Sequence, residues 1–262
     1  MSEGDKGSIG VLPIVLALVA GMAAGALGWR EFGSRPAGIA NDRAALEALV
    51  RETILDNPDI IPEAISRLQD REVEKLLASN REAIETPFRG AWAGNPEGDV
   101  VLVEFFDFAC PFCLQSKADI DRLLAEDPGL KVVWRDFPVL GPTSDQFAMA
   151  ALSAAGQGRY KAFIDAAFDR EGRLSESRLI PAVRAARLDE RQVAGDLTSS
   201  ELRQELDSNL ALGRALGLTG TPSYIIGDRI ISGAVGYAEL KEAIAAARKR
   251  ARPASGAGTA SR

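Results

Sequence analysis

The sequence predicts an α/β protein, and two observations carry this prediction. A run of β-branched and aromatic residues at 100–106 (VVLVEFF) has the composition of a buried strand, and a similar run follows at 131–137 (KVVWRDF). The segment LQSKADIDRLLAED between them has helical periodicity. A strand, a helix and a second strand of these lengths form a βαβ unit, in which the two strands are parallel.

The composition of the 262-residue chain excludes several classes of function. Without histidine, the chain can form neither a Ser-His-Asp or Cys-His catalytic centre nor a histidine-ligated metal site. Its two cysteines alone cannot close a structural zinc site, so we expect no bound metal. The net charge of −6 argues against a nucleic-acid partner, because binding to phosphates requires a basic surface.

Residues 1–30 contain a long apolar stretch. No residue from 7 to 29 is charged, and a helix that crosses a bilayer core needs about 20 such residues. Two interpretations remain open: an uncleaved membrane anchor, or a secretory signal peptide cleaved near Ala24 and Ala26. Acidic residues before the stretch favour the anchor, whereas the charges on its two sides do not decide its orientation.

Residues 31–90 are predicted to be a linker followed by a helical extension. Apolar residues recur at helical spacing over 45–54, until Asn57 and Pro58 end the run. A second helix is predicted at about 62–84, with a thin apolar stripe. This extension packs on the main domain, lies in solvent, or pairs with copies of itself. Two such stripes bury too little apolar surface to form a domain alone.

Residues 91–250 are predicted to form the main domain. An Ala-rich helical block occupies about 142–217, with helices starting near Arg159, Ser177, Asp189 and Ser199. Two short apolar runs at 223–226 and 229–232 are joined by Gly227 and Asp228, which predicts a β-hairpin. A last helix over 237–250 precedes an Ala/Gly/Ser tail, 251–262, that we expect to be disordered.

Cys110 and Cys113 lie where the first strand gives way to a helix. Pro111 suits a first helical turn, so the sulfur of Cys110 faces the open amides and the positive end of the helix. In such sites the pKa of cysteine falls from about 8.5 to between roughly 3.5 and 7.5. We therefore expect Cys110 to be the nucleophile and Cys113 the resolving thiol. The alternative is an inert bridge, but so short a loop adds little stability.

The residues VEFFDFACPFC, together with GTPS at 220–223, resemble the thioredoxin superfamily and, within it, the DsbA-like thiol-disulfide oxidoreductases of the bacterial envelope. The resemblance covers about 100–250 and implies a thioredoxin fold in which the helical block is an inserted domain. It also implies that the Thr221-Pro222 bond is cis and lies against the dithiol. The sequence alone would not indicate a cis bond, and the alternative for Pro222 is an ordinary proline at the start of a strand. The implied substrate-contacting residues are Pro111, Phe112, Thr221 and Pro222.

Two further positions bear on the chemistry that this resemblance implies. Glu104 occupies the place of a buried acid beneath the dithiol, where a raised pKa would let it relay the proton of Cys113. Its alternative is a solvated side chain at a sheet edge. Phe112 stands where the strongly oxidising relatives have histidine, so we expect a less depressed pKa for Cys110 and a weaker oxidant. Asp107 is expected to end the strand or cap the turn.

Residues 41–90, with the phrase ILDNPDIIPEAI, resemble the amino-terminal extensions of the ScsC-type and Com1-like branch, which implies a homo-oligomer. Together, the resemblances imply an envelope thiol-disulfide oxidase or isomerase that acts on cysteine-containing proteins without a dissociable cofactor. Its implied partner is a membrane redox protein of the DsbB-like or DsbD/ScsB-like kind, and its domain faces the periplasm. Two alternatives remain: a reductase fed by a membrane electron donor, and a membrane-anchored peptide-binding or chaperone module with a structural disulfide.

Overall fold

The computed structural model describes residues 37–169 and 172–251, and the chain divides into two units after Ser66. The predicted membrane anchor at 1–30 lies outside the described residues, as does the predicted tail except for Ala251, which ends the last helix. Within the described part of the chain, no helix has both the length and the apolar character that a membrane span requires.

The first unit consists of α2 (Ala37–Asp56) and the beginning of α3 (Ile60–Ser79). α2 ends directly before Asn57 and Pro58, where the sequence predicts a break, because the residue before a proline disfavours the helical conformation. Most of the large apolar side chains of this unit are exposed. They are Leu46, Leu49, Val50, Leu55, Ile60, Ile61 and Ile65.

The second unit is built on a five-stranded sheet with the strand order β1-β3-β2-β4-β5. The strands are β1 (Trp92–Gly94), β2 (Val100–Phe106), β3 (Leu130–Asp136), β4 (Ser223–Ile226) and β5 (Arg229–Ser232). β2 and β3 are parallel and are connected by α5 (Pro111–Glu126), which confirms the predicted βαβ unit. β4 and β5 form the predicted hairpin. β1, which pairs antiparallel with β3, was not predicted.

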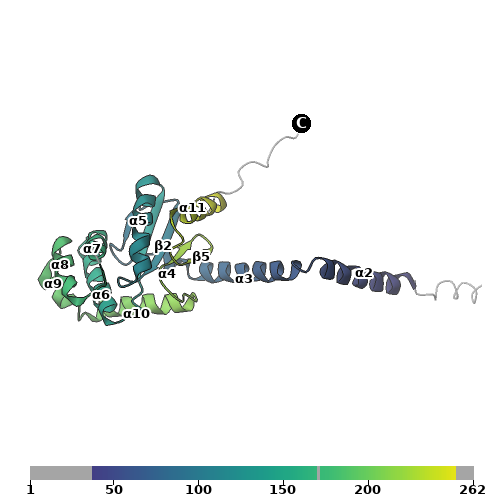
Figure 1. The fold of residues 1–262 in the computed structure, drawn as a ribbon, viewed down its shortest axis with the longest axis horizontal. Helices are drawn as coiled ribbons and strands as arrows, with labels where there is room; N and C mark the ends of the chain where they lie inside the picture. Colours follow the sequence, from purple (N-terminus) through teal and green to yellow (C-terminus); the bar gives the residue numbers. More distant parts are fainter. Residues whose placement is uncertain (1–36, 170–171, 252–262) are drawn as a thin grey trace, which may run out of the picture. The chain divides into compact units, whose positions relative to one another are not determined.

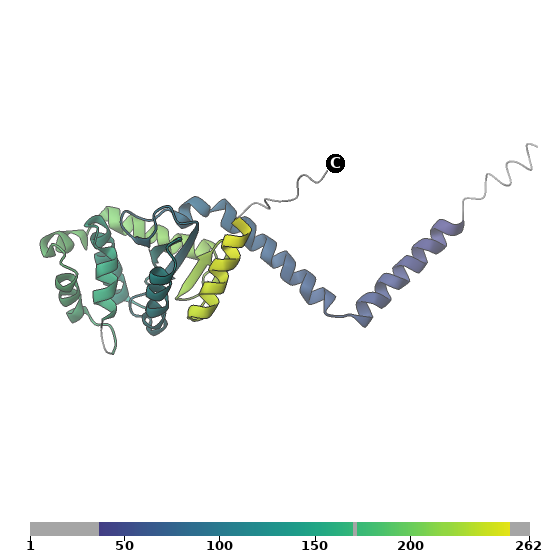
Figure 2. The ribbon, with the colours of Figure 1, turned by 90° about the horizontal axis from the view of Figure 1, so that it is seen from above.

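Helices cover both faces of this sheet. One face packs on α5 and α11 (Tyr237–Ala251), which lie side by side in Figures 1 and 2. The other face packs on the end of α3, α4 (Arg81–Glu85) and the end of α10 (Ser200–Ala215). Leu77 and Ile84 are buried on this second face, so this part of the predicted extension belongs to the main domain. The helix predicted over 62–84 is interrupted at Asn80.

The helical block between β3 and β4 is present as predicted. Before α10 it contains α6 (Pro142–Gly156), α7 (Tyr160–Phe168), η1 (Glu176–Arg178), α8 (Leu179–Ala185) and α9 (Glu190–Asp196). Figures 1 and 2 both show α7, α8 and α9 at the end of this unit that lies away from α11. Phe108, just after β2, packs its ring against Phe147, Phe163 and Phe168, and so joins the block to the sheet near the dithiol.

Candidate active site

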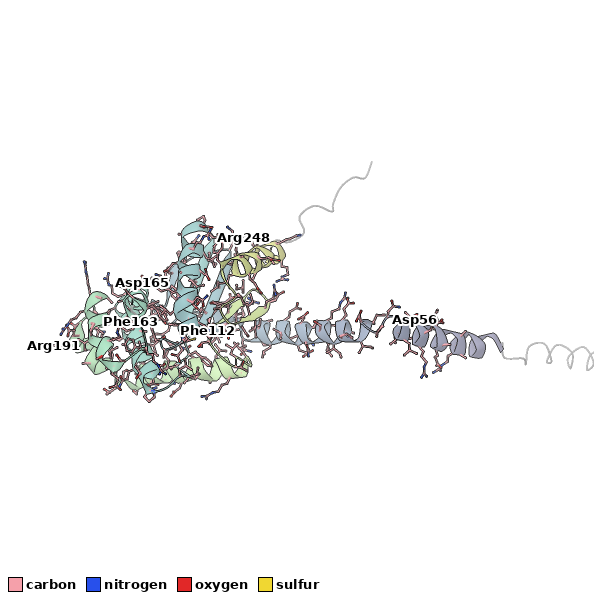
Figure 3. All side chains as sticks on the ribbon, viewed as in Figure 1. Asp56, Phe112, Phe163, Asp165, Arg191 and Arg248 are labelled. Atoms are coloured by element: carbon pink, nitrogen blue, oxygen red, sulfur yellow. The ribbon has the colours of Figure 1, made fainter. Side chains whose placement is uncertain are left out.

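The dithiol lies at the start of α5. β2 ends at Phe106, and a short turn places Cys110 directly before the helix, with Pro111 at the first helical position. Proline suits this position because it has no N–H group to leave unpaired. The Leu114 N–H donates to the Cys110 carbonyl oxygen at 3.2 Å, so Cys113 lies within the first turn. The predicted order of strand, dithiol and helix is therefore present, and Figure 3 shows Phe112 at this helix start.

Cys110 carries the more acidic of the two thiols. Both cysteines are free, and they expose only 3% and 2% of their surface. The pKa of Cys110 is lowered to about 5, chiefly because Cys113 donates a hydrogen bond to its thiolate. The Thr221 side chain and the backbone N–H groups at the helix start act in the same direction, and burial opposes them.

Cys113 has the opposite tendency. Burial raises its pKa, and the hydrogen bond to Cys110 and the negative charge of Glu104 raise it further. At neutral pH this site therefore contains a Cys110 thiolate and a Cys113 thiol. A thiolate is the nucleophile in disulfide exchange, so the geometry allows Cys110 to attack first and requires Cys113 to lose a proton before it reacts.

The Thr221-Pro222 peptide bond is cis, as the family resemblance implies. It lies against the dithiol, because the Thr221 carbonyl oxygen is 3.2 Å from Cys110 Sγ and accepts a hydrogen bond from it when the thiol is protonated. Ser223 then begins β4, which pairs with β2 in the register Phe105 to Ser223. The sheet register thus brings the two predicted parts of the site together.

Glu104 is buried beneath the dithiol and is 4% exposed. β2 runs between β3 and β4, so the alternative of a solvated edge side chain does not apply. Its carboxylate accepts hydrogen bonds from Trp134 Nε1 at 3.0 Å and from Ser116 Oγ at 3.3 Å. Burial raises the pKa of Glu104 to about 7, although both hydrogen bonds lower it. This value suits a group that gains and loses a proton near neutral pH.

Phe112 presents a ring that is 58% exposed, beside the buried sulfur atoms. Its backbone N–H helps to lower the pKa of Cys110, but its side chain has no charge to add. The resulting value of about 5 lies between those of DsbA, about 3.5, and thioredoxin, about 7. The milder redox behaviour that the sequence predicts for a phenylalanine at this position stays a prediction.

Asp107 does more than end the strand. Its carboxylate is 1% exposed and accepts from Ala109 N–H at 2.7 Å, Val139 N–H at 2.8 Å and Leu140 N–H at 2.9 Å. It also accepts from the Ser144 hydroxyl. One carboxylate therefore joins the turn before Cys110 to the loop that follows β3. The cap-like bond to Ala109 agrees with expectation, whereas the bonds to the distant loop were not foreseen.

Trp134 and Ser116 are the contacts of Glu104 that sequence reasoning missed. Trp134 pairs with Glu104 in the parallel register of β2 and β3, and Ser116 lies one turn after Cys113 on α5. A signal existed for Ser116, because residues three apart on a helix share a face. For Trp134 no local signal exists, since register between strands is set by the whole fold.

The family comparisons agree with this geometry. Residues 88–246 match the family model described as Thioredoxin, and residues 42–75 match the model described as Copper resistance protein ScsC N-terminal domain. Among curated proteins, the chain is 28% identical over 160 residues to the Na(+)/H(+) antiporter NhaA of Herminiimonas arsenicoxydans. That match covers 61% of this chain and 26% of the antiporter, so the chain spans about a quarter of the length of such relatives.

Three solved structures are similar over most of their own length. A thioredoxin-like oxidoreductase from Silicibacter pomeroyi is 37% identical, with a TM-score of 0.62, and the match covers 65% of this chain and 98% of that one. A linker-deletion mutant of Proteus mirabilis ScsC is 26% identical, with a TM-score of 0.63 and coverages of 83% and 100%. The thiol-disulfide exchange protein alpha-DsbA2 of Wolbachia pipientis is 27% identical, with a TM-score of 0.64 and coverages of 68% and 97%.

The match to the thioredoxin model includes the dithiol, the helical block and the cis-proline. The ScsC-type match adds the helical segment that precedes them. The chain therefore belongs to the thioredoxin family and, within it, to the DsbA-like thiol-disulfide oxidoreductases that carry an ScsC-type amino-terminal segment.

Proposed function

We propose that this protein exchanges disulfide bonds with cysteine-containing proteins of the cell envelope, through a mixed disulfide on Cys110. The observation that carries the proposal is the placement of the dithiol at the start of α5, with Cys110 Sγ 3.2 Å from the Thr221 carbonyl oxygen beside the cis-proline. The lowered pKa of Cys110 and the raised pKa of Cys113 support it. A purely structural bridge has no need of this difference. Pro111 and Phe112 follow Cys110 at the start of α5, the Thr221 carbonyl oxygen lies 3.2 Å from the Cys110 sulfur, and Pro222 follows across the cis bond. These four residues are the proposed contacts of the bound polypeptide.

The proposed reaction divides the work between the two cysteines. The Cys110 thiolate attacks a substrate disulfide, or a substrate thiolate attacks the disulfide of the oxidised enzyme, and a mixed disulfide forms. Cys113 resolves it when its sulfur attacks Cys110 and the substrate departs as a thiolate. Glu104 accepts the proton that Cys113 must lose, and it returns that proton when Cys113 is displaced. Its pKa of about 7 supports this role in both directions.

The preferred direction is oxidation or isomerisation. A lowered Cys110 pKa stabilises the reduced enzyme and so favours transfer of a disulfide to substrates. We propose a milder oxidant than a Cys-Pro-His-Cys enzyme, because Phe112 adds no charge. The first alternative is a reductase that receives electrons from a membrane donor. The second is a peptide-binding or chaperone module, for which the exposed Phe112 ring would serve as a contact.

Isomerase activity gains support from the first unit. Most of its leucine, valine and isoleucine side chains on α2 and α3 are exposed, and exposed apolar patches are typical of interaction sites. We propose that they pair with the same residues of other copies, so that several dithiols face one substrate. Full-length protein in mild detergent, analysed by light scattering, should be oligomeric, and the double substitution Leu46→Asp and Val50→Asp should yield the monomer. A monomeric parent protein would overturn this proposal.

We further propose that the domain lies on the periplasmic side of the inner membrane, tethered by residues 7–29 or released after signal cleavage. Disulfide chemistry is favoured in that compartment, which supports this placement. A membrane redox protein of the DsbB-like or DsbD/ScsB-like kind is the proposed electron partner. Protease added to spheroplasts should digest the domain, and protection of the domain would contradict the placement.

Cysteine substitution tests the central proposal. Cys113→Ser should trap covalent complexes with envelope proteins that dissolve on reduction, whereas Cys110→Ser should trap none and should abolish exchange on a model substrate. Undiminished exchange by Cys110→Ser would disprove the enzymatic function and leave the binding module. Alkylation of the two thiols in intact cells then gives the direction: a mostly oxidised pair indicates an oxidase, and a mostly reduced pair indicates an isomerase or reductase.

A further inference from the structure

Four charged side chains form a closed ring between α5 and α7. Lys117 contacts Asp121 at 2.5 Å and Asp165 at 2.8 Å, and Lys161 contacts Asp121 at 2.9 Å and Asp165 at 2.6 Å. Each lysine therefore touches both aspartates; we call these four residues the ion-pair ring. The side chains are 23–44% exposed, so the ring lies at the boundary between solvent and interior. Asp165 on α7 is labelled in Figure 3.

A narrow cavity leads inward from this ring. The buried residues Glu104 and Cys113 line it, together with the partly exposed Lys117, Asp121 and Lys161 of the ring. Its volume of about 10 Å³ is close to what one water molecule requires. The remaining wall is aromatic and aliphatic. It consists of Phe106, Ile120, Trp134, Ile164 and Phe168.

Glu104 has few other routes to solvent. The sheet closes it on two sides, because β3 and β4 flank β2. Trp134 Nε1 donates to one carboxylate oxygen, and an indole N–H is a donor only. Ser116 Oγ donates to the other oxygen and lies within the buried interior. A proton that Glu104 takes from Cys113 must nevertheless leave before the next cycle, and the cavity connects Glu104 with the ion-pair ring.

We propose that the ion-pair ring is the solvent end of a proton path that runs through this cavity to Glu104 and Cys113. The proposal rests on the proposed role of Glu104 and adds the residues that connect it to solvent. During resolution, the S–H bond of Cys113 breaks and its proton passes to the Glu104 carboxylate. The Cys113–Cys110 disulfide forms, and the substrate leaves with the bonding electrons as a thiolate. The proton then passes from Glu104 through water to the ring.

The charges of the ring also act on Glu104 directly. The negative charge of Asp121 raises the pKa of Glu104. Removing Asp121 must therefore lower this pKa, whereas removing the two lysine charges must raise it. The titratable groups that face Glu104 from the packed elements are Cys110, Cys113, Lys117 and Asp121 at α5, Tyr160 and Lys161 on α7, and Tyr224 on β4. Asp136 on β3 accepts a hydrogen bond from the Tyr160 hydroxyl.

The test separates the two chemical steps in the full-length protein. Reduced enzyme is mixed with glutathione disulfide and quenched with acid at successive times, and mass spectrometry measures the fractions of reduced, mixed-disulfide and oxidised enzyme. These fractions give separate rate constants for attack by Cys110 and for resolution by Cys113. The variants are Lys117→Met with Lys161→Met, Asp121→Asn, and Glu104→Gln. Lys241→Met is the matched control, because it removes a surface lysine that pairs with Glu126 at 3.1 Å, away from the cavity.

The double lysine variant should slow resolution at pH 7 by about fivefold or more, a modest part of what general acid–base groups contribute. It should move the pH midpoint of resolution upward, and Asp121→Asn should move it downward. Attack by Cys110 should match the parent protein in both variants. These opposite shifts of the pH midpoint of resolution distinguish a proton path from a merely structural ring. Loss of a structural ring would lower the melting temperature, and the pH midpoint of resolution in both variants would equal that of the Lys241→Met control.

The Glu104→Gln background shows which proposal fails. There, the lysine substitutions should slow resolution no further, because the ring acts through Glu104. Suppose that Glu104→Gln slows resolution. If the ring variants then behave like the Lys241→Met control, or if the lysine substitutions slow resolution equally in the parent protein and in the Glu104→Gln background, the proton path is overturned and the role of Glu104 stands. If Glu104→Gln leaves resolution unchanged, the role of Glu104 fails and the path fails with it.

Discussion

Cys110 Sγ lies 3.2 Å from the Thr221 carbonyl oxygen, across 111 positions of sequence, and donates a hydrogen bond to it when the thiol is protonated. This bond joins the first strand–helix junction to the loop that enters β4. The Thr221 side chain also lowers the pKa of Cys110. The residue that borders the proposed substrate groove thus helps to set the acidity of the nucleophile, so substrate binding and thiol reactivity are coupled at one residue.

Replacing Phe112 by histidine should make the enzyme a stronger oxidant. A protonated imidazole next to Cys110 would stabilise the thiolate and lower its pKa from about 5 toward the value of about 3.5 in DsbA. Each unit of that change should raise the reduction potential by roughly 30 mV. Thiolate absorbance against pH gives the pKa, and equilibration with glutathione gives the potential. Phe112→Leu is the uncharged control. A parent protein already near −120 mV would contradict the reasoning.

The features that local chemistry dictates could be predicted from the sequence. The dithiol turn follows from a buried strand run, a Pro at the first helical position and helical periodicity, and the hairpin follows from Gly227 and Asp228 between two apolar runs. The cis bond at Thr221-Pro222 required the family resemblance, because an isolated X-Pro bond is cis in only about 5–6% of cases.

Features that depend on long-range pairing were missed. β1 has three residues and ends in glycine, so only its pairing with β3 makes it a strand. The contact of Trp134 with Glu104 depends on the register of two strands. The ion-pair ring did have a local signal, a Lys followed four residues later by Asp on both α5 and α7, but the packing of these helices on each other cannot be read from either one.

Replacing Glu104 by glutamine should change how stability depends on pH. The pKa of Glu104 is raised from 4.5 to about 7, so between these values the folded chain holds a proton that the unfolded chain has lost. Stability therefore falls as pH rises through this window, by about 3 kcal/mol. Glutamine removes this loss. In urea titrations of the dithiol form, the free energy of unfolding of the variant, relative to that of the parent protein, should increase by about 3 kcal/mol between pH 4.5 and pH 8.

Glu126→Gln is the control for this titration. The pKa of Glu126 is lowered to about 2, chiefly by its hydrogen bond with Tyr237, so its contribution is lost only as pH falls below 4.5. The difference between this control and the parent protein should stay constant from pH 4.5 to 8. A Glu104→Gln difference that is equally constant would mean that Glu104 is already ionised in the folded protein at pH 5, and that it is no proton acceptor near pH 7.

Asp107→Asn should destabilise the fold by about 2–4 kcal/mol, because its second carboxylate oxygen accepts two N–H groups, from Val139 and Leu140. In one orientation, asparagine places its NH₂ group against the N–H groups of Val139 and Leu140. In the other, its oxygen accepts from these two groups, and its NH₂ group faces the Ala109 N–H and the Ser144 hydroxyl. Urea unfolding measures the loss. Limited proteolysis should cleave the variant faster within 138–141, because the loop between β3 and α6 loses its anchor.

Asp189→Asn gives the matched comparison. Asp189 also accepts two N–H groups, from Arg191 and Gln192, but both bonds go to one oxygen at the start of α9. Asparagine is as good an N-cap as aspartate, so this change should cost less than about 0.5 kcal/mol. Although both substitutions replace aspartate by asparagine, their effects on the free energy of unfolding should thus differ several-fold. Equal effects would mean that the loop after β3 is held by its apolar contacts, and that Asp107 does not join it to the dithiol turn.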